Sequence, residues 1–95
     1  MTTFSNTPSG RLIWYGNDAT SEKFDELLAS IERIDQVDVL LSVDDFDARR
    51  RILSCGGARV DLAYEHPWGI KMEALDGASD ALVRRWSAEA EKILQ

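Results

Sequence analysis

The chain contains very little cysteine and histidine, and this scarcity narrows its possible chemistry. Cys55 is the only cysteine and His66 the only histidine among 95 residues. No disulfide can therefore form within the chain, which agrees with a reducing compartment. A metal site would need mainly carboxylate ligands, and a nucleophile–histidine pair would need Cys55 or a serine beside His66. Neither arrangement has a sequence signature, so we expect no catalytic residues, no metal and no cofactor.

Long apolar runs are also absent. Stretches such as Val39-Leu40-Leu41 are far shorter than the roughly 20 apolar residues of a membrane-crossing helix. Residues 1–5 contain no basic segment followed by an apolar one, so an export signal is not expected. We predict a cytoplasmic protein without membrane contact.

Basic residues are outnumbered, with 11 Lys and Arg against 17 Asp and Glu and a net charge of -6. Nucleic-acid binders gain affinity by placing Lys and Arg on phosphates, so direct nucleic-acid binding is not expected. The acids gather in residues 18–47, which hold ten of them against Lys23 and Arg33. Such a surface keeps a protein soluble or attracts a basic protein partner.

Composition and length predict one folded domain. A hydrophobic share of 44% and a charged share of 29% are typical of globular proteins, and 95 residues suffice for one modest core. Residues 1–10 are small and polar and predict a flexible leader. The domain is expected to span residues 11–95.

Hydrophobic periodicity predicts most of the elements. In chain order they are a strand over 12–15, a helix over 20–34, a strand over 37–43 with Val37, Val39, Leu41 and Val43 on one side, an antiparallel hairpin over 60–64 and 70–74, and a helix over 79–94. Trp14 and Trp86 fit buried positions in the first strand and the last helix.

Residues 44–57 fit two structures. A helix is favoured, because Asp44 can cap its start and Gly56 stands where a C-terminal glycine belongs. The alternative is a strand that includes Arg51-Ile52-Leu53-Ser54, which would give a longer antiparallel meander.

The element order predicts an α/β or α+β domain, with helices packed on a mixed four-stranded sheet. The alternative is a strand and a helix followed by an antiparallel meander and a C-terminal helix. As an order of elements, the first version resembles the thioredoxin-like arrangement of glutaredoxins. That family has a Cys-x-x-Cys motif after the first strand, where this chain has Gly16-Asn17-Asp18-Ala19, and a cis-proline before the hairpin, where none stands near Arg59-Val60. The resemblance therefore implies no redox function.

Two groups of residues are candidates for a partner-binding site. Trp68 lies in a Pro-Trp-Gly loop beside Glu65 and His66, where a rigid aromatic side chain can anchor an interface or fold back over the sheet. Asp44, Asp45 and Asp47 follow a predicted strand. They would suit a Mg²⁺ or phosphoryl site, although helix capping is the favoured explanation.

These observations predict a non-catalytic protein-binding module and, more specifically, an acidic inhibitor of another protein. Immunity proteins, antitoxins and anti-CRISPR proteins are examples of this class, and a partner with a basic surface is expected. The alternative is a small thioredoxin-like or phosphoryl-handling enzyme that uses Cys55 or the three aspartates. A homodimer formed through an exposed strand edge is a third alternative.

Overall fold

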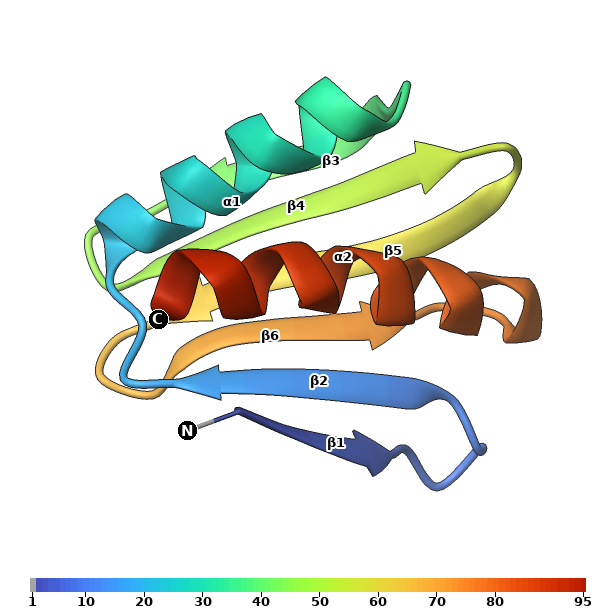
Figure 1. Cartoon of the computed structure of the whole chain (residues 1–95), viewed down its shortest axis with the longest axis horizontal. Helices are drawn as coiled ribbons and strands as arrows, with labels where there is room; N and C mark the ends of the chain where they lie inside the picture. The colour runs from blue at the N-terminus through green and yellow to red at the C-terminus, as the bar shows by residue number, and fades with distance from the viewer. Residues whose placement is uncertain (1) are drawn as a thin grey trace.

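Six strands form one antiparallel sheet, and two helices cover one of its faces (Figure 1). The computed structural model describes residues 2–95. The order across the sheet is β1-β2-β6-β5-β4-β3. The elements are β1 (Thr2–Asn6), β2 (Leu12–Asn17), α1 (Ser21–Ile34), β3 (Asp38–Asp44), β4 (Ala48–Cys55), β5 (Ala58–Glu65), β6 (Gly69–Ala74), the short 3-10 helix η1 (Gly77–Ser79) and α2 (Asp80–Leu94).

The predicted mixed four-stranded sheet is wrong, because every pair of neighbouring strands is antiparallel. β2 and β3 do run in the same direction, but β6, β5 and β4 lie between them. Helix α1 carries the chain across the sheet from β2 to the far edge (Figure 1). The strand–helix–strand unit therefore makes no parallel pair, and the thioredoxin-like order does not hold.

Strand β1 lies within the segment expected to be a flexible leader. It pairs with β2 and places Phe4 opposite Trp14. The Thr2 hydroxyl donates a hydrogen bond to a Glu91 carboxylate oxygen of α2 at 3.1 Å, and the Arg84 guanidinium lies 5.7 Å from the centre of the Phe4 ring. Residues 2–6 are thus held by the sheet and by α2, while Met1 lies outside the described residues.

The helix favoured for residues 44–57 is wrong, because Ala48–Cys55 form strand β4. The residues of β4 that face the helices include Arg49 and Arg51, whose guanidinium carbons lie 4.8 and 5.9 Å from the centre of the Phe24 ring. Their methylene stems occupy core-side positions that are usually apolar, and this hides the strand alternation. The predicted cap, Asp44, instead ends β3.

A two-residue turn joins β4 to β5. Both of its residues are glycines with positive φ, +57° for Gly56 and +84° for Gly57, as a type I′ hairpin turn requires. Gly56 is therefore a hairpin residue and not the end of a helix.

The expected alternation in the second predicted strand is interrupted by a bulge. The register of β3 against β4 shifts between Val39 and Leu41. Val39 lies opposite Leu53 on the helix-covered face, whereas Leu41 lies opposite Ile52 on the other face. The prediction that these apolar residues share one side is wrong, because the extra residue of a bulge reverses the facing of those beyond it.

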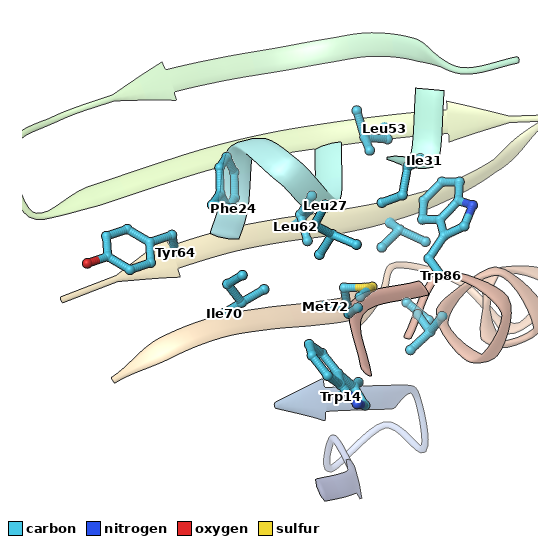
Figure 2. Close-up of a cluster of buried hydrophobic side chains, with 14 of the residues drawn as sticks. Trp14, Phe24, Leu27, Ile31, Leu53, Leu62, Tyr64, Ile70, Met72 and Trp86 are labelled. Carbon is cyan, nitrogen blue, oxygen red and sulfur yellow. The ribbon is translucent and has the colours of Figure 1, made fainter. Parts of the chain in front are cut away.

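The core lies between the helices and the central strands (Figure 2). Helix α1 begins as predicted, with the Thr20 side chain accepting a hydrogen bond from the Lys23 N–H at 3.2 Å. It packs Phe24 and other apolar residues against β5, and α2 contributes Trp86. The predicted burial of Trp14 and Trp86 is confirmed, since neither exposes any surface. No helix within residues 2–95 is long and apolar enough to cross a bilayer.

Candidate protein-interaction surface

One face of the sheet, called the open face here, carries no helix (Figure 1). Side chains alternate between the two faces of each strand, so those out of register with the buried core residues point to it. They include Leu41, Val43, Arg50, Ile52, Asp61, Ala63, Lys71, Glu73 and Tyr15. Its most buried charge is Asp61, whose carboxylate accepts hydrogen bonds from Arg50 Nε and Nη2 at 3.0 and 2.7 Å.

Edge strand β3 is the most exposed element of the sheet. All seven of its residues are exposed, and its only strand neighbour among the described residues is β4. Figure 2 shows that it contributes none of the labelled core side chains. Four of its seven residues are nevertheless large and apolar, namely Val39, Leu40, Leu41 and Val43. The strand thus presents an unpaired backbone edge together with apolar side chains, which is the combination used for pairing with another chain.

Two turns lie side by side at one end of the sheet and bring both predicted groups of site residues together. The turn between β3 and β4 contains Asp45 and Asp47, and the turn between β5 and β6 contains His66 and Trp68. The His66 N–H donates a hydrogen bond to the Asp47 carbonyl at 2.8 Å. We call the exposed residues of these turns, together with Glu65, the tip surface; they are Asp45, Phe46, Asp47, Glu65, His66, Pro67 and Trp68.

The tip surface displays two aromatic side chains. Phe46 is 99% exposed and Trp68 is 71% exposed, although hydrogen bonds hold both turns. The Asp45 N–H donates to the Ala48 carbonyl at 2.8 Å, and the Asp18 N–H donates to the Trp68 carbonyl at 3.2 Å. Large exposed aromatics on fixed turns have the features of interface anchors, because little conformational freedom is lost on binding.

Asp44 differs from Asp45 and Asp47 because it is bound to two arginines. Its carboxylate accepts hydrogen bonds from Arg51 Nη1 at 3.0 Å and from Arg49 Nε at 2.8 Å. These bonds, that of Arg51 first, lower the pKa of Asp44 to about 2. Arg49 also pairs with Asp25 at 2.8 Å. Asp44 therefore joins β3 to β4 and α1, and its charge is already neutralised.

The acids of the tip surface, unlike Asp44, have no arginine partner among the described residues. Within residues 2–95, Asp45, Asp47 and Glu65 take part in no ion pair. Of the three consecutive arginines of β4, Arg49 and Arg51 are largely covered and bound to Asp44, and Arg50 is paired with Asp61. The tip surface thus combines uncompensated negative charge with exposed aromatic rings.

The Asp44 cluster predicts a specific loss of stability in acid. The ionised Asp44 carboxylate stabilises the fold fully at pH values above 3.8, its pKa in the unfolded chain. This contribution is lost as the pH falls towards about 2, its pKa in the folded chain. We expect Asp44→Asn to lower the urea midpoint at pH 6, with the difference from wild type shrinking between pH 4 and 2. Urea unfolding measured across this range checks it. Asp45→Asn is the matched control, and an equal, pH-dependent effect of both variants would contradict the prediction.

Two shallow hollows lie on the open face beside the tip surface. One hollow of about 230 Å³ is lined by residues that include Tyr15, Glu65 and Trp68. A second, of about 210 Å³, is lined by residues that include Val43 and Glu65. Ala63 and Glu65 line both hollows, which therefore adjoin on the open face.

The residues named for the alternative enzymatic chemistries lie at different places in the fold. Cys55 ends strand β4, half-buried at the opposite end of that strand from the three aspartates. His66 lies at the tip surface, with its Nδ1 3.5 Å from the Tyr64 hydroxyl. In the part of the chain that the structure describes, no three His, Cys, Asp or Glu side chains converge to hold a metal ion.

Sequence reasoning missed Phe46, Tyr15 and the two hollows. Phe46 stands between Asp45 and Asp47. In a turn, an apolar residue between two acids is expected to be exposed, but this segment was predicted to be helical. Gly56-Gly57 could have shown the turn, because it is a typical two-residue hairpin loop and implies a strand on each side. With a strand before Gly56, residues 45–47 become a turn between two strands.

In comparisons with known proteins, no family model matches the chain, and no curated protein or solved structure gives a significant match.

Proposed function

We propose that this chain is a non-catalytic protein-binding module that pairs edge strand β3 with an extended segment of another protein. The observation that carries the proposal is β3 itself, which has seven exposed residues, of which four are large and apolar. Added strands gain main-chain hydrogen bonds at such an edge, and their side chains gain contacts on alternating sides. The tip surface, with Phe46, Trp68, His66, Glu65 and its aspartates, extends this binding surface.

Charge favours a basic partner over a second copy of this chain. Both ends of β3 carry acids, Asp38 at the start and Asp44 and Asp45 at the end. Antiparallel pairing of two copies around Leu41 would bring Asp38 of one copy to the end of β3 in the other, next to Asp45, which takes part in no ion pair within residues 2–95. Like charges brought together on facing strands are unfavourable. A segment with Lys or Arg at its ends has the complementary charge.

The more specific proposal is inhibition of the partner, in the manner of immunity proteins, antitoxins or anti-CRISPR proteins. Its support is electrostatic: a net charge of -6 and the uncompensated carboxylates of the tip surface. An acidic inhibitor can cover a basic substrate-binding site by charge complementarity. In this proposal the chain acts in the cytoplasm and touches no nucleic acid itself.

Variants of the two sheet edges test the binding proposal. The double variant Val39→Lys/Val43→Lys places charge on both faces of β3, and Thr3→Lys/Asn6→Lys does the same on the opposite edge, β1. We expect wild type and the β1 variant to capture the same protein from cells of the source organism, and the β3 variant to capture at least about tenfold less, because buried charge opposes strand addition. Quantitative mass spectrometry with cross-linking checks it.

Two results would contradict this function. One is equal capture by both variants, which would place the interface elsewhere. The other is a wild-type chain that forms dimers in light scattering and loses them in the β3 variant, since a second copy would then be the occupant of the edge. Unchanged thermal unfolding of each variant ensures that the comparison concerns folded protein.

A further inference from the structure

The hollow beside Trp68 has the composition of a site for one cationic side chain. Its volume is about 230 Å³, below the roughly 300–1,000 Å³ of pockets that hold small-molecule ligands. Its lining residues include two aromatic residues, Tyr15 and Trp68, and the acid Glu65. Aromatic faces attract cations, and a carboxylate adds charge-assisted hydrogen bonds.

The turn that presents Trp68 is fixed on both sides. The Trp68 carbonyl accepts a hydrogen bond from the Asp18 N–H at 3.2 Å, and the His66 N–H donates to the Asp47 carbonyl at 2.8 Å. Gly69, which follows, packs against the backbone of β2, where an added Cβ would lie 2.2 Å from the Gly16 carbonyl oxygen. The indole is therefore exposed on a rigid support, which reduces the entropy lost on binding.

The charges around the hollow leave it negative. Glu65 has no ion-pair partner among the described residues, whereas the Lys71 ammonium lies 3.6 Å from a Glu73 carboxylate oxygen. Lys71 is the only basic residue that lines the hollow, and Glu73 offsets its charge. The uncompensated carboxylate of Glu65 thus decides the sign of the site.

We propose that this hollow binds an arginine side chain of the partner, with the guanidinium stacked on Trp68 and hydrogen-bonded to Glu65. A guanidinium is planar, stacks on aromatic faces and binds a carboxylate through two parallel N–H bonds, whereas an ammonium is a more strongly hydrated point charge. The inference rests on the proposed function, because the arginine belongs to the bound protein. It adds the chemical identity of one anchor residue.

Nuclear magnetic resonance with a small probe tests the site without the partner. N-acetyl-arginine-methylamide is titrated into the wild-type chain, and the indole N–H signals of the three tryptophans are followed. We expect a saturable shift of the Trp68 signal with a dissociation constant on the order of 1–10 mM. The buried Trp14 and Trp86 are internal controls whose signals should not move.

Matched probes and variants identify the chemistry. The citrulline analogue, which has the same shape without the charge, should bind at least about tenfold more weakly, and the lysine analogue should bind more weakly than arginine. Glu65→Gln should weaken arginine binding about tenfold, and Trp68→Ala should abolish it. Equal shifts with citrulline, tighter binding of acetate, or no saturation at high arginine concentration would overturn the assignment.

The result of this titration can be distinguished from the result of the capture experiment that tests the proposed function. The titration involves the hollow alone, so its failure would remove the arginine site and leave capture through β3 intact. Arginine binding without loss of capture in the β3 variant would retain the site and contradict strand addition.

Discussion

Replacing Gly69 with alanine is expected to destabilise the fold by about 3 kcal/mol or more. Gly69 has a φ of +114°, which side-chain-bearing residues rarely adopt. Its added Cβ would also lie 2.2 Å from the Gly16 carbonyl oxygen and 3.0 Å from the Asp18 backbone nitrogen. Because these atoms belong to the backbone, relief requires β2 and β6 to separate. Urea unfolding monitored by tryptophan fluorescence measures the change.

Gly56→Ala separates conformational strain from lack of space. Gly56 also has a positive φ, +57°, but a Cβ added there would have no atom within 4 Å. We expect this variant to cost about 1–2 kcal/mol, the usual penalty for a left-handed residue. If the two variants were equally destabilised, the close contact between Gly69 and β2 would not be the cause.

Replacing Trp86 with alanine is expected to cost about 3–5 kcal/mol, as for other fully buried aromatics. The side chain exposes no surface, and its indole N–H donates a hydrogen bond to Asp35 Oδ2 at 2.8 Å. Arg85 Nε donates to the same oxygen at 2.8 Å. Trp86 therefore fills the core and also holds the end of α1 against α2. Denaturant unfolding of the variant gives the loss of free energy.

Phenylalanine variants of Trp86 and Trp14 separate the contribution of the indole hydrogen bond from that of the buried ring. The Trp86 N–H is hydrogen-bonded, whereas the Trp14 N–H, also buried, has no partner within residues 2–95. Trp86→Phe removes a hydrogen bond, and Trp14→Phe removes an unpaired polar group, so the former should cost about 1 kcal/mol more. Both variants stay useful if Trp86→Ala does not fold. A larger cost for Trp14→Phe would contradict the reasoning.

The elements that follow simple periodicity were predicted correctly from the sequence. Helix α1 and the hairpin of β5 and β6 place apolar residues at regular intervals, because one face of each meets the core. Strand β4 was missed because its core-side positions include Arg49 and Arg51, whose long stems substitute for apolar side chains. The order of strands was not predictable, since it depends on pairings between residues distant in the chain.

The candidate site was predicted in parts but not as a surface. Loop composition identified Trp68 and the aspartates separately, and the structure places their turns side by side because β4 and β5 form one hairpin. Asp44 was grouped with Asp45 and Asp47 by its position, although Arg49 and Arg51 neutralise it. The exposure of β3 had no local signal, because an alternating apolar strand looks the same at an edge and at the centre of a sheet.

The exposed apolar edge of β3 also makes aggregation a hazard for the free protein. A segment such as Val39-Leu40-Leu41 at an unpaired edge is a template for growth of the sheet by further copies. Asp38 before it and Asp45 after it act as gatekeepers, since stacked copies would bring their charges together. The bulge between Val39 and Leu41 further interrupts the flat edge that such growth requires. The acids around β3 thus protect the chain from its own copies while leaving the strand open to a partner of opposite charge.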